Sequence, residues 1–245
     1  MHHGMRKQVL DYDDVMDKQR RAVYAERDAI LDGADIEGRA IGHARDIIGA
    51  IVEETCGESR RREERDVDGL NAWVGDMTGD ESFDAAELGE DADELADGIE
   101  AAFAERWDAR REAMGEEAFG ELCRRVLLRS LDQRWVDHLV DMDHLRQGMG
   151  LRGLARRDPL VEYKSEAFHF FGDFVREVYA DLLRTMLRLK AEGGVREDEV
   201  VPEEGNPFRE ENLSYSKSGE STIQDESDLP AMADIAGEVD IEADD

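Results

Sequence analysis

The stretch LRQGMGLRGLARRDP, Leu145–Pro159, separates two long segments in which apolar residues recur every three or four positions. Such periodicity is typical of amphipathic helices. Glycine and proline favour a change of chain direction between them. The pattern therefore predicts two helices, Glu116–Gly148 and Leu160 to about Glu192, which pack against each other antiparallel as a hairpin.

The ends of these helices are marked by particular residue types. Asp158 suits the N-cap of the second helix and Pro159 its first position. On the first helix we expect Trp135, Leu139 and Met142 to form the buried face. Three glycines are expected to end that helix and to let the chain reverse: Gly148, Gly150 and Gly153.

The connecting stretch is basic, although the chain as a whole carries a net charge of −31. Arginines are interleaved there with apolar residues, so the turn offers both charge and apolar contact to a partner. The alternative interpretation is an ordinary solvated loop. The residues predicted to make the contact are Gly148, Met149, Leu151, Arg152, Leu154, Arg156 and Arg157.

The preceding part of the chain also reads as helical. A long helix over residues 5–32 carries a narrow stripe spaced by three and four, and Gly33 is expected to end it. Asp35 is a suitable N-cap for a second helix, Ile36–Cys56, and a third is expected at about Asp91–Met114. The stripe of the first helix consists of Val9, Tyr12, Met16, Gln19, Val23, Glu26 and Ile30.

Composition limits the function classes. Among the 245 residues, 62 acids stand against 31 bases, which argues against nucleic acid as the main partner. No run is apolar and long enough for a transmembrane helix, and no secretory signal is visible, so we expect a cytoplasmic protein. The start of the chain suggests that it begins inside a larger protein. Residues 193–245 are predicted to be a disordered acidic tail.

Three enzymatic or metal-binding patterns were weighed. The run DDVMD, Asp13–Asp17, matches an aspartate-rich pattern that binds magnesium-diphosphate, but no partner cluster accompanies it. His138, Asp141 and His144 are spread too widely around a helix to converge on one metal. None of the five lysines follows a glycine, so a phosphate-binding loop is absent. The two isolated cysteines, Cys56 and Cys123, are predicted to be buried.

Two long segments, Arg6–Leu31 and Leu127–Phe171, resemble the SecA family of bacterial preprotein translocase ATPases. RKQVLDYDDVMDKQRRAVYAERDAIL (Arg6–Leu31) resembles the long helix of its helical scaffold. LLRSLDQRWVDHLVDMDHLRQGMGLRGLARRDPLVEYKSEAFHFF (Leu127–Phe171) resembles its two-helix finger. The resemblance implies an all-α fold with helical scaffold at 5–50, helical wing at 51–115, scaffold and finger at 116–192, and tail at 193–245.

The resemblance also implies a mechanical and regulatory role. Family members bind ATP and magnesium in nucleotide-binding domains, which are missing here, so the chain itself would be neither an enzyme nor a cofactor-binding protein. The implied partners are those domains, the SecYEG channel and the preprotein, at the inner face of the cell membrane. An anionic membrane surface and a second copy of the chain are further partners to test. The residues expected to contact the motor domains are Asp13, Asp14, Arg20 and Arg21.

Two departures from the family pattern matter. Many members carry a tyrosine at the tip of the finger loop, where this chain has Leu154. Many also end in a zinc-binding segment rich in cysteine and histidine, which this tail lacks, so no metal site is expected there. The alternative function is an independent helical adaptor or coiled-coil module that shares only the hairpin.

Overall fold

The computed structural model describes residues 2–57, 65–89, 91–152 and 159–189, and within these ranges every regular element is a helix. The predicted all-α fold is therefore confirmed for the described chain. The predicted disordered tail, 193–245, lies outside the described residues. The elements, in order, are α1 (His2–Leu31), α2 (Ile36–Cys56), α3 (Val67–Thr78), the short 3-10 helix η2 (Ala85–Glu87), α4 (Ala92–Met114), α5 (Glu116–Arg152) and α6 (Pro159–Arg188).

The described chain divides into two compact units, and helices α5 and α6 each have one part in either unit. Unit 1 contains residues up to 29, together with 132–152 of α5 and 159–175 of α6. Unit 2 contains residues 30–131 and the last part of α6, from 176 onward. We call the unit 1 parts of α5 and α6 the finger.

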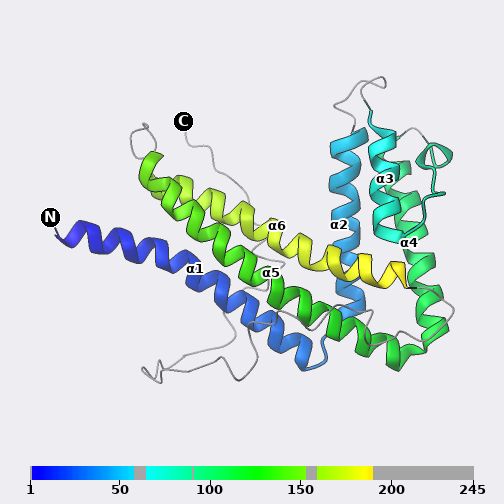
Figure 1. Cartoon of the computed structure of the whole chain (residues 1–245), viewed down its shortest axis with the longest axis horizontal. Helices are drawn as coiled ribbons and strands as arrows, with labels where there is room; N and C mark the ends of the chain where they lie inside the picture. The colour runs from blue at the N-terminus through cyan, green and yellow to red at the C-terminus, as the bar shows by residue number, and fades with distance from the viewer. Residues whose placement is uncertain (1, 58–64, 90, 153–158, 190–245) are drawn as a thin grey trace. The chain divides into compact units, whose positions relative to one another are not determined.

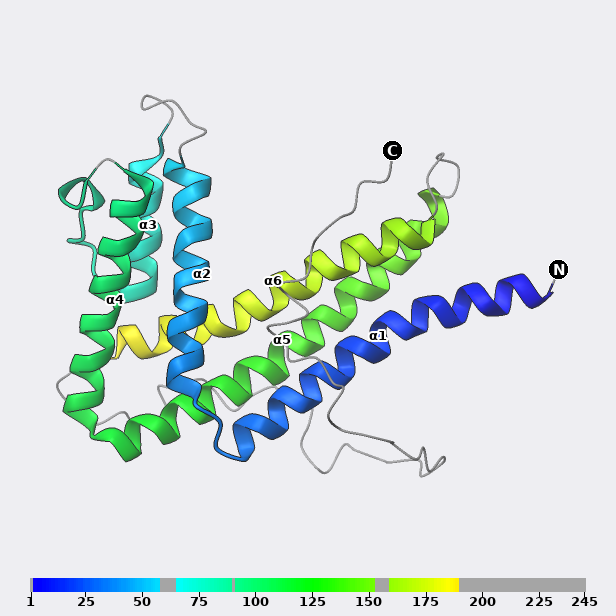
Figure 2. The same ribbon diagram turned by 180° about the vertical axis from the view of Figure 1, so that it is seen from behind.

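In unit 1, α1 lies alongside both finger helices (Figure 1 and Figure 2). The contacts between α1 and α5 show that the two helices are antiparallel, because the residue number on α5 decreases as the residue number on α1 increases. In the contacts between α1 and α6 the residue numbers of both helices increase together, from Tyr12 with Tyr163 to Gln19 with Ala167. These two helices are therefore parallel. The α1–α5 pairs are Asp13 with Arg146, Gln19 with His138, and Arg27 with Asp132.

The finger helices are antiparallel to each other, as predicted. His138 on α5 packs its ring against Phe171 of α6, and Trp135 packs against Phe174, so the α6 number rises as the α5 number falls. All four rings lie in the buried interior of unit 1. The apolar stripe of α1 covers this hairpin, with Val23 only 3% exposed. Burial of this stripe is the main stabilising contribution to the three-helix arrangement.

In unit 2, α2 packs beside α3 and α4 (Figure 2). The helices begin at aspartate N-caps: Asp35 accepts from the backbone N–H of Gly38, and Asp91 accepts from that of Asp93. Each cap satisfies a donor that the first helical turn leaves without a backbone partner. A ring contact between Trp107 of α4 and Phe119 at the start of α5 joins these helices across the Gly115 turn.

The prediction that Gly148 and Gly150 end α5 was wrong, whereas Gly153, the third glycine of that prediction, lies outside the described residues. The helix continues through Arg152, and Gly148 has a helical conformation with nothing within 4 Å of the position its Cβ would take. A helical glycine costs only about 1 kcal/mol relative to alanine. Burial of Met149, which is 2% exposed, offsets that cost in the same turn. At Gly33 the prediction was correct, because this residue follows α1 with φ of +92°.

The predicted buried face of α5 also needs one correction. Trp135 and Met142 are buried as expected, but Leu139 is 37% exposed and its neighbour His138 is only 4% exposed. The cause is tertiary: His138 has a polar partner on α1, so the histidine side faces the interior and the leucine is rotated outward. Periodicity on α5 alone does not contain that information.

Candidate functional site

The end of the finger nearest its connecting loop is held by an apolar cluster that includes α1. Its buried members come from α5 and α6, and three half-buried residues of α1 pack against them. Within it the rings of Tyr12 and Tyr163 are 4.6 Å apart. The cluster consists of Met142, Leu145, Met149, Tyr163 and Ala167, with Tyr12, Val15 and Met16 packed against it.

The predicted contact residues fall into three structural groups. Gly148 and Met149 are helical, and Met149 belongs to the buried cluster, so its side chain stabilises the base of the loop. Leu151 and Arg152 form the last turn of α5. The remaining predicted residues, Leu154, Arg156 and Arg157, lie outside the described residues. The role of the whole set in contacting a partner stays a prediction.

The charged residues predicted to contact motor domains lie on exposed parts of α1, and each has a partner within the chain. Asp13 accepts a bond from Arg146 of α5 at 3.2 Å. Asp14 pairs with Lys18 one turn later at 3.0 Å. Arg20 and Arg21 both pair with Asp17. These exposed pairs are worth little energetically and exchange readily for an external partner.

The same pairs bear on the aspartate-rich pattern DDVMD. Its outer carboxylates, Asp13 and Asp17, are both neutralised by arginines in the structure. Their charges are thus directed toward guanidinium groups and not toward a common point. Within the described ranges, no group of three or more His, Cys, Asp or Glu side chains is placed to hold a metal ion. That includes His138, Asp141 and His144.

Gln19 is the residue that sequence reasoning did not single out as functional. It lies in the apolar stripe of α1, is 4% exposed, and uses both ends of its amide. Its Nε2 donates to the backbone carbonyl of Ala167 on α6, and its Oε1 lies 3.0 Å from Nε2 of His138 on α5. A carbonyl oxygen can only accept, so the amide orientation is fixed and His138 must donate from Nε2. The sequence signal that could have pointed to this residue was a polar glutamine between the apolar residues Met16 and Val23 of the stripe.

His138 is held as a neutral imidazole. Burial lowers its pKa from 6.5 to about 4, and the carboxylate of Asp141 opposes this shift only in part. The ring lies among Trp135, Phe171 and Phe174, with centroid distances of 5.3–5.8 Å. An apolar, aromatic surrounding disfavours the charged form of the ring. His138 therefore acts as a neutral hydrogen-bond donor to Gln19.

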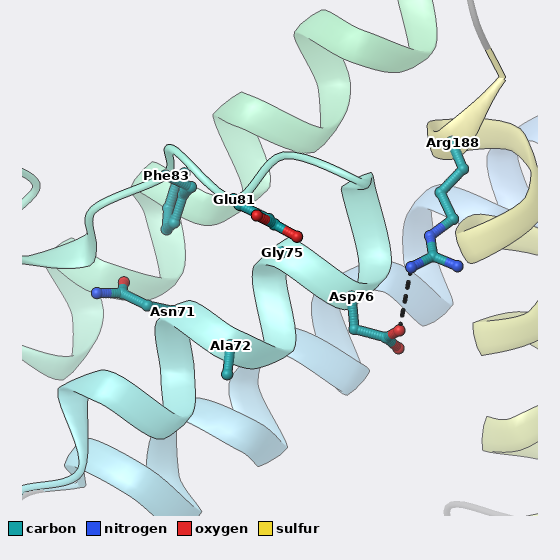
Figure 3. A pocket seen from close by; sticks show the side chains of 7 residues that line it. All are labelled: Asn71, Ala72, Gly75, Asp76, Glu81, Phe83 and Arg188. Carbon is teal, nitrogen blue, oxygen red and sulfur yellow. Dashed lines mark hydrogen bonds and ion pairs between the residues drawn. The ribbon is translucent and has the colours of Figure 1, made fainter.

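Unit 2 contains an open cleft of about 410 Å³ between α3, the loop that follows it, and the end of α6 (Figure 3). At one side Asp76 accepts bonds from Arg184 at 3.0 Å and from Arg188 at 3.2 Å. These pairs tie α3 to the end of α6. The residues lining the cleft are Asn71, Ala72, Gly75, Asp76, Glu81, Phe83 and Arg188.

The described helices were also compared with the requirements of a bilayer. None of them combines the length and the apolar character that crossing a membrane demands.

The chain is similar to known proteins over most of its length. Residues 1–190 match the family model described as SecA Wing and Scaffold domain. The chain is 32% identical to the protein translocase subunit SecA of Finegoldia magna over 212 residues, which is 86% of this chain and 23% of the relative. It is 36% identical to the same subunit of Desulforamulus reducens over 223 residues, 85% of this chain and 25% of the relative.

A third relative, the protein translocase subunit SecA of Heliobacterium modesticaldum, is 36% identical over 190 residues, which is 76% of this chain and 22% of that protein. The chain thus spans about a quarter of the length of the curated relatives it matches. The matched region, residues 1–190, contains all the helices described above. On the strength of that match, the chain belongs to the SecA wing and scaffold family.

Proposed function

We propose that this chain is the wing and scaffold part of a SecA-type protein-export motor. In this proposal α1 braces the ATP-hydrolysing domains and restrains their turnover. The finger presents its basic loop to the SecY channel and to the preprotein in transit. ATP and magnesium bind the motor domains and not this chain, and the assembly works at the cytoplasmic face of the cell membrane.

The observation that carries the proposal is the family match over residues 1–190, because it covers α1, the wing helices and both finger helices together. A module that shared only the hairpin would not be expected to match α1 and the wing as well. The relatives are named as subunits of the protein translocase. The export role of this chain is inferred from that relationship.

The geometry of unit 1 supports a mechanical role for the finger. Its end is anchored by the apolar cluster and by α1, so residues 153–158 connect two helices that are packed together as far as Met149 and Tyr163. A rigid support lets a short loop transmit force or position, whereas a loose hairpin would bend instead. The arginines between the finger helices add positive charge to a chain in which acids outnumber bases 62 to 31.

The first test measures ATP turnover by the motor portion of the Desulforamulus reducens translocase, prepared without its own wing and scaffold. Adding this chain in trans is expected to lower the turnover in a saturable manner. The charge reversals Asp14→Lys and Arg20→Glu should weaken that effect. Asp46→Lys on the exposed face of α2 is the matched control and should not. Unchanged turnover at saturating chain would refute the restraint.

The second test places a cysteine at the finger loop. The chain's own thiols, Cys56 and Cys123, are buried, so Leu154→Cys introduces a selectively accessible one. In an assembled complex with the channel and a stalled preprotein, this cysteine is expected to cross-link to SecY or to the preprotein. A cysteine at Tyr24, which is 53% exposed on α1, is the control position. If Leu154→Cys cross-links no better than Tyr24→Cys, the loop does not enter the channel.

A further inference from the structure

We propose that Gln19 fixes the axial register of α1 against both helices of the finger, and that finger displacement reaches α1 through this side chain. It is a positioning residue and takes no part in chemistry. The transmission to α1 rests on the proposed function, whereas the register itself is a property of unit 1 alone.

The polar contacts between α1 and α5 include three that differ in how strictly they hold position. The outer two are ion pairs, Asp13 with Arg146 on the surface and Arg27 with Asp132, whose side chains are 43% and 31% exposed. In the first pair the side chains are 55% and 46% exposed. Exposed pairs of this kind adapt to small displacements because their side chains have many rotamers and water replaces the partner. They do not define the register sharply.

The central contact is different because it is buried and engages two helices at once. Gln19 donates to Ala167 of α6 and accepts from His138 of α5, each at 3.0 Å. Sliding α1 by one residue moves its side chains by about 1.5 Å, which breaks both bonds. The broken state would leave a buried amide and a buried imidazole N–H without partners, which is strongly unfavourable.

The apolar residues around Gln19 do not impose the same restriction. Met16 and Val23 flank it on the stripe of α1, and their contacts are non-directional. A displaced helix can exchange one such contact for another with little loss. A single buried polar side chain in an apolar helix seam is the best-attested device for setting register. On the described part of α1 two such side chains are buried, Gln19 at 4% and Glu26 at 6% exposed, and Gln19 is bonded to both finger helices.

An amide side chain is the group that meets both hydrogen-bonding requirements of this position. The carbonyl oxygen of Ala167 needs a donor, and the N–H of His138 needs an acceptor. Glutamate has no donor to offer, and methionine has about the same length but neither function. The variant Gln19→Met therefore keeps the apolar packing and removes both bonds. The matched control is Met16→Leu, a volume-conserving change one turn away on the same stripe.

The first arm of the experiment follows the register in the chain by NMR. In the wild type, the His138 ring should show a proton on Nε2 that exchanges slowly with water, and the Tyr12 and Tyr163 rings should show cross-relaxation. Gln19→Met should lose the slow exchange and weaken or broaden the Tyr12–Tyr163 signal, whereas Met16→Leu should retain both. The register proposal is overturned if Gln19→Met leaves both signals as in the wild type.

The second arm repeats the ATP-turnover assay with the same three chains. If only the registered state of α1 restrains the motor, Gln19→Met should need on the order of tenfold more chain for half-maximal restraint, as expected when its two buried hydrogen bonds are lost. Equal half-saturation for Gln19→Met and Met16→Leu overturns the transmission through Gln19. No restraint even by the wild type refutes the proposed function instead, and the NMR arm then decides the register by itself.

Discussion

Acidification from pH 7 to pH 4 should destabilise unit 1 through His138. Burial lowers the pKa of this imidazole from 6.5 to about 4. In the unfolded chain the ring takes up a proton as the pH falls through its ordinary pKa, so between pH 6.5 and pH 4 the unfolded state binds more protons. Stability therefore falls with pH across this window. Linkage gives a loss of about 2 kcal/mol at pH 5 and about 3 kcal/mol at pH 4.

The assay is urea unfolding at pH 7, 5 and 4, for the wild type and for His138→Phe, which has no titrating group at this position. Carboxyl groups with shifted pKa values, such as Asp132, whose pKa is raised by burial, contribute equally to both chains and cancel in the comparison. The wild type should lose about 3 kcal/mol more than the variant by pH 4. Equal losses in the two chains, or an NMR titration of His138 centred near 6.5, would show that the ring is not buried as described.

Three further predictions concern single residues. Burial raises the pKa of the Cys123 thiol to about 12, so alkylation of the folded chain at pH 8 should be on the order of a thousandfold slower than in urea; similar rates would contradict this. Leu131→Ala removes a side chain that is 0% exposed and should lower the free energy of unfolding by about 2–5 kcal/mol in urea titrations, and a loss below 1 kcal/mol would be inconsistent with its burial. Arg146→Ala breaks an exposed pair with Asp13 and should cost under about 1 kcal/mol, with no cost left at high salt; a larger, salt-independent loss would argue against an exposed pair.

Local signals were sufficient for the helices with strong ends. The span of α2 follows from Asp35, whose side chain caps the helix, and from Gly57, where it stops. α4 likewise begins after Asp91 and ends before Gly115, which has φ of +84°. In these cases the residues that determine where the helix begins and ends lie within one turn of its end, so the local sequence is enough to predict its span.

Where a distant segment decides, the sequence pattern was insufficient. On α5, His138 and Leu139 are neighbours, and periodicity favoured the leucine as the buried one. The partner that reverses this choice, Gln19, is 119 residues away. Gly148 is similar, because its helical state depends on Met149 packing into a cluster shared with α6.

In the candidate site too, some residues can be identified from local sequence and others only from distant contacts. The basic character of the finger loop could be seen from composition, and with it residues such as Arg152. The exposed position of Asp14 and Arg20 on α1 follows from their place opposite the apolar stripe. The role of Gln19 could be recognised only in the structure. From the sequence alone, a lone glutamine in the stripe could equally be a polar residue at the edge of the helix contact.

The long separation between Gln19 and its partners has a consequence for synthesis on the ribosome. Ala167 follows Gln19 by 148 residues, with the wing helices between them. At about 5–20 residues per second, α1 emerges on the order of 10–30 s before the second finger helix. Until α5 has been made, the apolar stripe of α1 has no native surface to cover it, while α2, α3 and α4 of unit 2 are already present. Unit 1 is thus completed only when residues 159–175 of α6 have been made, and unit 2 only when the following part of α6 has been made. A nascent chain arrested before residue 159 would hold α1 and α5 without the α6 surface that packs against both.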